Sequence, residues 1–417
     1  MAVDSTHFLS GRKVVVCGAG LGGLSFVLSL FKYWDAAVPA PEVILVDADG
    51  REESIKRGLY DLQLNADTED SALVGLRDLG LFDAVLAQAV TQNNPDATMH
   101  VWDKSWKSIT TIKPKLAPGF STGGVRIRRG DLVALLVEAV EARTKISWGT
   151  SVQDAKRLPD GTLRVSLLDK ASGAASQQEC DLVVAADGDE STLRKIFRPA
   201  DVTKLTGHVA IGGQVDFGNR TSAPAPLTSD FGITVGGDGV ASAVVQLNND
   251  GKLLWSVFKE EKTPRAAYDN ADAAAFRALM DEARASSKSI AEPLPTLIGQ
   301  TKQETSFARP VRERDAFGHD AHELRGIVFI GDSNRFVSVY MNNGGTLAIR
   351  DGINLAQELV AQASLEAATA AYDKAALARS TKSLKAGRQT MNTAHLSGWK
   401  WGVAKTALSA GSFLSGN

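Results

Sequence analysis

Hydrophobic and polar positions follow two kinds of pattern along the chain. Short apolar runs rich in β-branched residues are typical of strands buried on both faces, and they occupy residues 13–17, 42–46, 181–185 and 327–330. Longer segments with apolar residues three and four apart are typical of helices, and they cover residues 24–31, 70–90 and 129–140. This alternation predicts a doubly wound α/β fold, in which helices cover a parallel sheet.

The segment 209–258 has a different character. It holds several short strand-like runs separated by the turns Gly236-Gly237-Asp238-Gly239 and Asn248-Asn249-Asp250-Gly251. Such spacing of strands and turns is typical of antiparallel hairpins. We therefore expect an antiparallel sheet inserted into the α/β fold, then a helix at 271–285 and mostly helical chain from 346 to about 413.

Composition sets limits on partners and location. The 417 residues are 44% hydrophobic, and their net charge of -2 gives no electrostatic attraction to nucleic acid or to an anionic membrane. No run of about 18 apolar residues occurs, so no membrane span is predicted. Cys17 and Cys180 predict neither a disulfide framework nor a zinc site. The start of the chain lacks a secretory pattern, and a cytoplasmic location is expected.

A glycine-rich loop between a predicted strand and a predicted helix is the first candidate site. It reads Gly18-Ala19-Gly20-Leu21-Gly22-Gly23. Gly18 permits a tight turn, Gly20 lets the backbone approach a pyrophosphate, and Gly23 lets helix and strand pack closely. Asp47 follows the next strand, where an acid can accept hydrogen bonds from an adenosine ribose and disfavours a 2′-phosphate. The spacing predicts a dinucleotide site.

Two further motifs close buried strands with a small residue and an acid. Asp187-Gly188 follows the third predicted strand, and Gly331-Asp332 follows the fourth. The turn Gly344-Gly345-Thr346 then opens the next predicted helix. Each motif alone is most often an ordinary turn, so only their combination and order are informative.

In this order the motifs resemble those of the FAD-dependent aromatic hydroxylases of the para-hydroxybenzoate hydroxylase type, the group A flavin monooxygenases. That family combines a Gly-x-Gly-x-x-Gly start, a central Asp-Gly motif and a late Gly-Asp motif. Its Arg-x-x-Leu-x-x-x-Leu helix is matched by Arg129, Leu132 and Leu136, and the resemblance spans residues 12 to about 380. Within that family, the sequence most resembles the tetracycline-inactivating monooxygenases. The resemblance lies in the stretches Gly50-Arg51-Glu52 and Gly58-Leu59-Tyr60-Asp61-Leu62.

The resemblance implies a non-covalently bound FAD and assigns residues to its dinucleotide part. The three glycines of the first motif would carry the pyrophosphate, and Asp47 would hold the adenosine ribose. Arg129 would reach the ribose or the pyrophosphate, with Arg128 as the alternative. Asp187 would shape the groove near the pyrophosphate, and Asp332 would contact the ribityl-phosphate region.

The resemblance also implies which residues surround the flavin ring. Gly344, Gly345 and Thr346 would lie against its pyrimidine edge, where backbone N–H groups at a helix N-terminus suit the negative charge of reduced flavin. Asp61 and Arg51 would lie near the ring and are the expected catalytic side chains.

The implied activity is a single-component monooxygenation. NAD(P)H, with NADPH preferred, would reduce FAD, and dioxygen would give a flavin hydroperoxide that hydroxylates an aromatic or polycyclic small molecule. The chain has one dinucleotide fingerprint, so NAD(P)H is expected to dock transiently as a co-substrate without a Rossmann site of its own.

The chain departs from the family pattern in the flavin-side loop. Family members usually read Gly-Asp-Ala-Ala-His and then a Pro, whereas this chain reads Gly331-Asp332-Ser333-Asn334-Arg335 and then Val339-Tyr340-Met341-Asn342-Asn343. Tyr340 and Asn342 are the candidates to replace the missing Pro and His in shaping the substrate cavity. The alternatives kept open are a flavin oxidase, dehydrogenase or halogenase on the same scaffold, and a non-catalytic flavin-binding redox protein.

Three other patterns predict structure instead of chemistry. Gly398-Trp399-Lys400-Trp401 is similar to the Trp-x-Trp signature of flavin-dependent halogenases but lacks the Ile-Pro that follows it there, so a packing role is expected. His319 and His322 have no identifiable third ligand, so no metal is predicted and a solvated connection is expected. A basic stripe is expected on a solvated helix face; it comprises Arg379, Lys382, Lys385 and Arg388.

The expected architecture has three parts. Residues 1–77, 105–198 and 305–375 would form a discontinuous FAD-binding domain of the glutathione-reductase-like Rossmann type. Residues 78–104 and 199–304 would form the inserted substrate domain, and 376–417 would form a C-terminal helical region.

Overall fold

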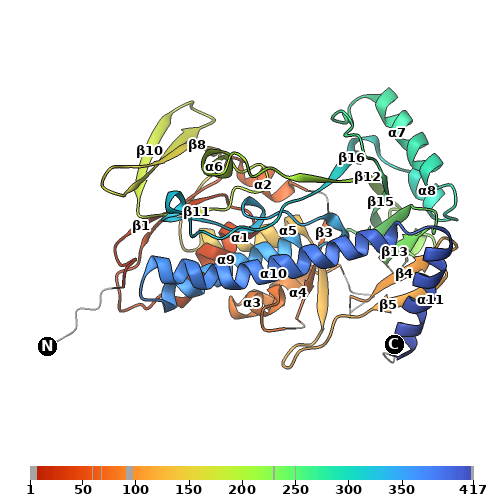
Figure 1. Ribbon diagram of the computed structural model, residues 1–417, viewed down its shortest axis with the longest axis horizontal. Coiled ribbons are helices and arrows are strands. Elements are labelled where there is room, and N and C mark those ends of the chain that lie inside the picture. The colour runs from red at the N-terminus through yellow and green to blue at the C-terminus, as the bar shows by residue number, and fades with distance from the viewer. Residues whose placement is uncertain are drawn as a thin grey trace.

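A computed structural model describes residues 7–58, 60–66, 68–90, 97–228, 231–248 and 250–414. Leu59, Asn249 and the first six residues, which belong to patterns used above, lie outside the described residues. The structure has the predicted α/β class. A parallel sheet and a larger, mostly antiparallel sheet lie toward opposite ends of an elongated molecule, and helix α10 (Leu365–Ala394) runs between them (Figure 1).

Five parallel strands form the first sheet. Its central strand β1 pairs with β11 on one side and with β2 on the other, so that Val15 lies opposite Val183 and Ile44. The predicted runs 13–17 and 42–46 are strands over those same bounds, because β-branched side chains suit a sheet buried on both faces. In spatial order the strands are β17 (Ile327–Phe329), β11 (Leu182–Ala185), β1 (Lys13–Cys17), β2 (Glu42–Val46) and β7 (Ile146–Ser147).

The two faces of this sheet are covered by different layers. Val14 and Val16 face a helical core, whereas Val15 and Cys17 face a three-stranded sheet. The helices are α1 (Leu21–Tyr33), α5 (Arg129–Glu141) and α9 (Gly344–Ala361). The three strands are β10 (Ala175–Cys180), β9 (Leu163–Asp169) and β8 (Thr150–Arg157), and the short helix α6 (Thr192–Phe197) lies beside β8.

Two short helices replace the single helix expected across 70–90. α3 (Ala72–Asp78) ends just before Gly80, and α4 (Phe82–Gln88) begins just after it. Gly80 has φ = +78°, which lies outside the helical region. The helical spacing of apolar residues therefore continues across a break in the helix.

The second sheet has seven strands and combines two distant parts of the chain. β13 and β4 pair in parallel, and the other neighbours pair antiparallel. β5 and β16 lie beyond the ranges expected for the substrate domain, and those domain bounds remain a prediction. In spatial order the strands are β16 (Phe307–Glu313), β12 (Lys204–Asp216), β15 (Lys252–Glu260), β14 (Ala241–Gln246), β13 (Phe231–Val235), β4 (Met99–Asp103) and β5 (Ser108–Ile112).

Helices α7 (Ala273–Ser286) and α8 (Leu294–Gly299) cover one face of the seven-stranded sheet, where Trp255 is fully buried against them. We call the opposite face the inner face. It contacts segments that lead back to the parallel sheet, since the Phe231 ring lies 4.0 Å from the Arg126 guanidinium of β6 (Gly124–Arg128). β6 pairs with β3 (Asp61–Asn65), which follows the short helix α2 (Arg51–Lys56).

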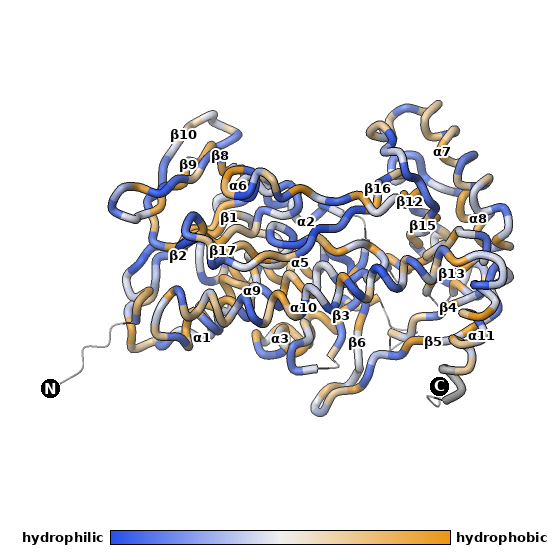
Figure 2. Tube along the Cα trace, in the orientation of Figure 1, coloured by the Kyte–Doolittle hydropathy of each residue, from blue (hydrophilic) through white to orange (hydrophobic). Residues whose placement is uncertain are grey.

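Hydrophobic residues gather in the central strands and in α1 and α9, whereas α10 alternates between hydrophobic and hydrophilic positions (Figure 2). The buried side of α10 has a spacing of four residues, which is one stripe of a helix; it includes Ala368, Tyr372, Ala376 and Ser380. α10 therefore packs along the body by one face and leads to the last helix, α11 (Gly398–Leu414).

Candidate cofactor site

The carboxyl ends of four neighbouring parallel strands meet at one edge of the five-stranded sheet. The strands β17, β11, β1 and β2 are consecutive in that sheet. Each leads directly into one of the predicted dinucleotide residues, namely Asp332, Asp187, Gly18 and Asp47 respectively. Open α/β sheets bind ligands at this edge, so the fold brings four separate sequence motifs to one place.

The glycine loop after β1 needs its glycines for different reasons. Gly18 has φ = +114°, and a Cβ there would collide with the carbonyl oxygen of Ala186. A Cβ on Gly23 would collide with the carbonyl oxygen of Gly18. A Cβ on Gly20 would instead have no atom of the described residues within 4 Å. Gly20 is thus the position where a group from outside the chain can approach the backbone.

Asp47 braces this loop. Its carboxylate accepts hydrogen bonds from the N–H groups of Ala19 (2.6 Å) and Asp49 (2.8 Å). Burial raises the pKa of Asp47, and the hydrogen bond from Ala19 opposes that rise. The acid therefore orders the glycine loop, and its contact with an adenosine ribose stays a prediction.

Asp187 carries an oxygen without a protein partner. Its Oδ2 accepts a hydrogen bond from the N–H of Leu193 (3.2 Å), while its Oδ1 is buried and has no hydrogen-bond donor among the residues that the structure describes. Burial raises the pKa of this carboxyl group. A buried acceptor without a donor is costly unless a ligand or water satisfies it. The residue therefore fits a ligand rich in hydroxyl groups, such as FAD.

A buried acid on helix α9 fixes the Gly331-Asp332 loop. Asp351 of α9 accepts a hydrogen bond from the N–H of Gly331 (3.1 Å) and pairs with Arg335 (3.0 Å), which lies 3.5 Å from Asp332. Asp332 keeps 38% of its side chain exposed, although its depth in the protein raises its pKa. Its carboxylate thus faces open space while the rest of the loop is fixed.

Two buried arginines tie this loop to its surroundings. Arg194 donates to the carbonyl oxygens of Ser333 (3.1 Å) and Asp189, so it joins the Asp187-Gly188 turn to the Gly331-Asp332 loop. Arg314 donates to the carbonyl oxygen of Asp332. Burial, with the charge of Arg194, lowers the pKa of Arg314 to about 10, so Arg314 remains a cation at neutral pH.

Helix α9 begins with uncapped backbone N–H groups. Its N-cap residue, Asn343, accepts a hydrogen bond from the Ser383 hydroxyl (3.0 Å) and caps nothing. The first turn holds no acidic residue. The positive end of an 18-residue helix is therefore left free for an anion or a polarised ligand.

The side chains of this first turn do not all face a ligand. A Cβ on Gly345 would lie 2.7 Å from the Leu62 side chain, so β3 packs closely there. The Thr346 hydroxyl donates to the carbonyl oxygen of Gln63 (2.9 Å). The Thr346 side chain is therefore engaged within the protein, and its backbone remains available to a cofactor.

Helices α1 and α9 pack backbone to backbone. A Cβ on Gly22 would lie 3.3 Å from the carbonyl oxygen of Ala348, and one on Gly352 would collide with the carbonyl oxygen of Gly22. This contact places the start of α1 beside the first turns of α9. Because the N-cap side of α1 at Gly20 is also uncapped, two helix N-termini offer free N–H groups to one region.

Arg129 is buried, and its side chain stabilises the end of helix α2. Its guanidinium donates to the carbonyl oxygens of Ser54 (3.0 Å) and Arg57 (2.7 Å), which end helix α2. The exposed Arg128 pairs with its neighbour Asp131 (2.6 Å). A direct contact of Arg129 with FAD remains a prediction.

The buried position of Arg129 has a measurable consequence. Arg129→Ala should lower the free energy of unfolding by about 2–4 kcal/mol, because two buried carbonyl groups lose a charged donor. Arg128→Ala is the matched control and should cost less than about 1 kcal/mol, as expected for an exposed ion pair. Urea unfolding measures both, and equal effects would show that Arg129 merely begins a helix.

The structure does not bring the two expected catalytic residues together. Asp61 is buried and pairs with the buried Arg126 at the inner face. Burial raises the pKa of Asp61 while the charge of Arg126 opposes the rise. Arg51 instead pairs with Glu141 (2.9 Å) at the far end of α5, and both side chains are partly exposed. Glu141 lies about 18 Å from Arg129 along α5, because an α-helix rises about 1.5 Å per residue.

Several important residues were not found by sequence reasoning. Arg126, Asp351, Arg335 and Arg314 are buried charges whose partners lie far away in sequence. The depth of the Tyr60 hydroxyl in the protein raises its pKa and the charge of Arg129 opposes the rise, although 40% of the residue is exposed. Of these, Arg335 and Tyr60 lie in stretches quoted above, but the local pattern assigned no role to their side chains.

Two expectations about isolated residues need correction. His319 is buried, not solvated: its ring contacts Asp373 (2.6 Å) and accepts a hydrogen bond from the N–H of Phe329 (2.8 Å). His322 is exposed, and no group of three potential metal ligands exists among the described residues. Arg379 is also mostly buried, because it pairs with Asp351 (3.1 Å); it does not belong to a solvated stripe.

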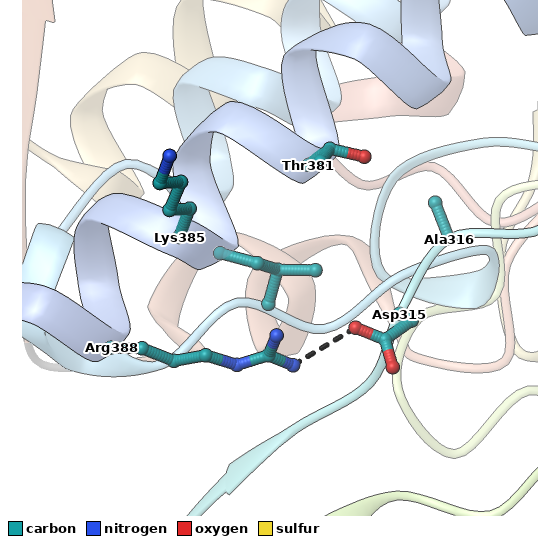
Figure 3. A pocket seen from close by; sticks show the side chains of 6 residues that line it. Asp315, Ala316, Thr381, Lys385 and Arg388 are labelled. Atoms are coloured by element: carbon teal, nitrogen blue, oxygen red, sulfur yellow. Dashed lines mark hydrogen bonds and ion pairs between the residues drawn. The ribbon is translucent and has the colours of Figure 1, made fainter.

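The Trp-x-Trp element and a cavity beside α10 lie apart from the predicted site. Trp401 packs against Gly237, as expected, while Trp399 is 76% exposed. A cavity of about 350 Å³ lies between α10 and the segment after β16 (Figure 3). The Arg388–Asp315 ion pair (2.9 Å) crosses it, and no predicted site residue lines it. Within the described ranges, no helix has the length and apolar character needed to cross a membrane.

Comparisons with known proteins agree with this geometry. The family model described as FAD binding domain matches residues 12–389. Monooxygenase cfoF from Aspergillus candidus is 32% identical over 391 residues, which is 93% of either chain. Aurachin C monooxygenase/isomerase from Stigmatella aurantiaca is 24% identical and covers 87% of this chain and 84% of its own.

Solved structures share the fold. HpxO from Klebsiella pneumoniae, complexed with FAD and uric acid, has a TM-score of 0.75 at 17% identity and covers 98% of this chain and 95% of its own. The tetracycline destructase Tet(55) has a TM-score of 0.69 at 16% identity, with 97% of both chains covered. The predicted resemblance is confirmed: the chain belongs to the FAD-binding-domain family and is an FAD-dependent monooxygenase.

Proposed function

We propose that this enzyme takes electrons from NADPH, activates dioxygen with bound FAD, and hydroxylates an aromatic or polycyclic small molecule. The observation that carries the proposal is the pair of uncapped helix N-termini at the carboxyl edge of the parallel sheet. Bound FAD would supply the redox chemistry of the reaction. Glycines 18, 20 and 23, with Asp47, Asp187 and Asp332, would hold it.

The chain would contribute electrostatics at the flavin. The free N–H groups at Gly344 and Gly345 lie at the positive end of α9. Placed beside the cofactor ring, they would stabilise negative charge that appears on reduction. They cost no reorganisation when the charge forms, because the backbone of the turn is already fixed by Leu62 and by the hydrogen bond of Thr346.

The inner face of the seven-stranded sheet supports a flat substrate. Two rows of residues cross it in register, and each row combines small side chains with one aromatic ring, Phe307 in the first and Phe258 in the second. The Phe307 ring covers Gly212, and together with Phe258 it gives this face a planar apolar surface, which suits a planar apolar ligand. The rows are Ile233, Ala243, Ser256, Gly212, Phe307 and Val235, Ala241, Phe258, Ala210, Arg309.

Two fold neighbours are consistent with that substrate class by name, one complexed with uric acid and one a tetracycline destructase. The exposure of Trp399 to solvent favours monooxygenation over halogenation. The test is the reaction itself. Holoenzyme should oxidise NADPH with consumption of dioxygen, and one atom of labelled dioxygen should enter a phenol, hydroxyanthraquinone or tetracycline from a panel. Flavin that NADPH and NADH both fail to reduce would overturn the proposal.

Asp61 is expected to act through Arg126. Arg126 covers the Phe231 ring on the inner face, and Asp61 neutralises it. Asp61→Asn keeps the shape of the side chain but removes the charge, so Arg126 should shift and admit water near the flavin. We expect retained FAD and about tenfold more hydrogen peroxide per NADPH consumed, equivalent to about 1.4 kcal/mol.

The matched control for this change is Glu141→Gln, which removes the acid from the Arg51 pair at the far end of α5. It should leave peroxide release at the wild-type level. Equal peroxide release from Asp61→Asn and wild type would place Asp61 outside the reaction space, and a rise with Glu141→Gln would restore Arg51 as a catalytic candidate.

A further inference from the structure

A cluster of titratable side chains lies beside the loop that leads into α9. The Tyr340 hydroxyl lies 2.5 Å from Nε2 of His395, and Nδ1 of His395 lies 2.6 Å from the carbonyl oxygen of Gly239. The His208 ring lies 4.3 Å from the His395 ring and is tilted by 39° to it. None of these residues belongs to the cofactor site described above.

The cluster joins three separate segments of the fold. Tyr340 lies in the turn Val339–Met341, just before α9. His395 caps the C-terminus of α10, and Gly239 belongs to the turn between β13 and β14. The Tyr340 ring also packs on the inner face, 5.0 Å from the Phe258 ring. One imidazole thus connects the flavin-side loop, the long helix and the substrate sheet.

The hydrogen bonds define the state of the imidazole. A carbonyl oxygen only accepts, so Nδ1 of His395 carries a proton and donates it to Gly239. In the neutral ring Nε2 is then an acceptor, and the Tyr340 hydroxyl donates to it. A second proton would remove this acceptor and place a charge in a half-buried site next to His208.

We propose that neutral His395 is a positioning residue, which holds Tyr340 and thereby sets the loop and the first turn of α9 where they meet FAD. The proposal rests on the proposed function only in taking FAD as the ligand of α9. Protonation of His395 would release Tyr340 and weaken FAD binding.

The surrounding charges agree with a neutral resting state. Burial lowers the pKa of His395, and the charge of His208 lowers it further, whereas the Gly239 carbonyl and Glu260 of β15 oppose the shift. Tyr340 stays protonated, because burial raises its pKa. A histidine with a lowered pKa stabilises the assembled state above its ordinary pKa of about 6.5 and loses this contribution as pH falls. The pH window of the effect therefore lies below about 6.5.

The experiment compares the dissociation constant of FAD at pH 8 and at pH 5.5 in wild type and two variants. His395→Gln can still donate to Gly239 and accept from Tyr340 but does not titrate. It should bind FAD as wild type does at pH 8 and lose less affinity on acidification. Tyr340→Phe should bind FAD about 2- to 12-fold more weakly at pH 8, as expected for one lost hydrogen bond.

Controls separate positioning from general acid effects. His322→Gln changes an exposed histidine and should reproduce the wild-type pH dependence. The His395 imidazole proton signal in NMR gives a second readout, since added FAD should lower its pKa by linkage. An identical pH dependence in wild type and His395→Gln would overturn the proposal. A protein that bound no FAD at any pH would refute the proposed function instead, while the NMR pKa in Tyr340→Phe would still test the contact.

Discussion

Gly20→Val should give a folded protein that no longer binds FAD. Gly20 has φ = -82° and ψ = -172°, which valine adopts readily, and an added Cβ meets no protein atom within 4 Å. The side chain would instead fill the space above the start of α1, where a pyrophosphate must approach the backbone. We expect FAD affinity to fall at least about 100-fold, which corresponds to about 2.8 kcal/mol.

Gly50→Val is the matched control for this substitution. Gly50 is also a helix N-cap with extended backbone and with no atom near an added Cβ. Both variants should lose about 1 kcal/mol of stability from a poorer N-cap, as measured by urea unfolding. Only Gly20→Val should lose the visible flavin absorbance. Flavin retained by folded Gly20→Val would remove the glycine loop from the cofactor site.

Asp351→Ala should strongly destabilise the protein. Asp351 is buried and satisfies Arg335 (3.0 Å), Arg379 (3.1 Å) and the N–H of Gly331 (3.1 Å) at once. Removing this acid takes the buried partner from both arginines, so that Arg335 keeps Asp332 (3.5 Å) and Arg379 keeps the more exposed Asp70 (3.2 Å); breaking such a buried pair costs about 3–5 kcal/mol. The Gly331-Asp332 loop would lose its anchor as well, so weaker FAD binding should accompany the lower stability.

Asp315→Ala provides the comparison, because Asp315 also pairs with two cations, Lys204 and Arg388 (2.9 Å each), but is half exposed. Its loss should cost less than about 1 kcal/mol. Urea unfolding of the two variants at neutral pH makes the comparison. A loss below about 1 kcal/mol for Asp351→Ala would show that the buried network contributes little.

The parallel sheet was predictable because its signal is local. Residues 13–17 and 42–46 are apolar runs whose bounds match β1 and β2, since a strand buried on both faces needs apolar side chains throughout. The interruption at Gly80 was not predictable from spacing, because apolar residues keep a helical period on both sides of it. The pairing of β4 with β13 joins segments more than a hundred residues apart, and no local pattern encodes it.

In the candidate site, too, the backbone turns were predictable from local sequence, whereas the side-chain contacts were not. Gly18, Gly20 and Gly23 could be assigned roles from spacing alone, and the structure gives each a distinct geometric environment. Thr346 and Arg51 are different, because their side chains are engaged by Gln63 and Glu141, partners that no motif reveals. Side-chain direction follows from tertiary packing, whereas the position of a backbone turn follows from local sequence.

The central claim is that one FAD lies non-covalently at the carboxyl edge of the parallel sheet. The most direct measurement is a titration of flavin-free protein with FAD, followed by acid precipitation and assay of flavin in the supernatant. The account predicts one FAD bound per chain in wild type, all of it released by acid. Protein that took up no FAD, or that kept its flavin in the acid precipitate, would contradict the account.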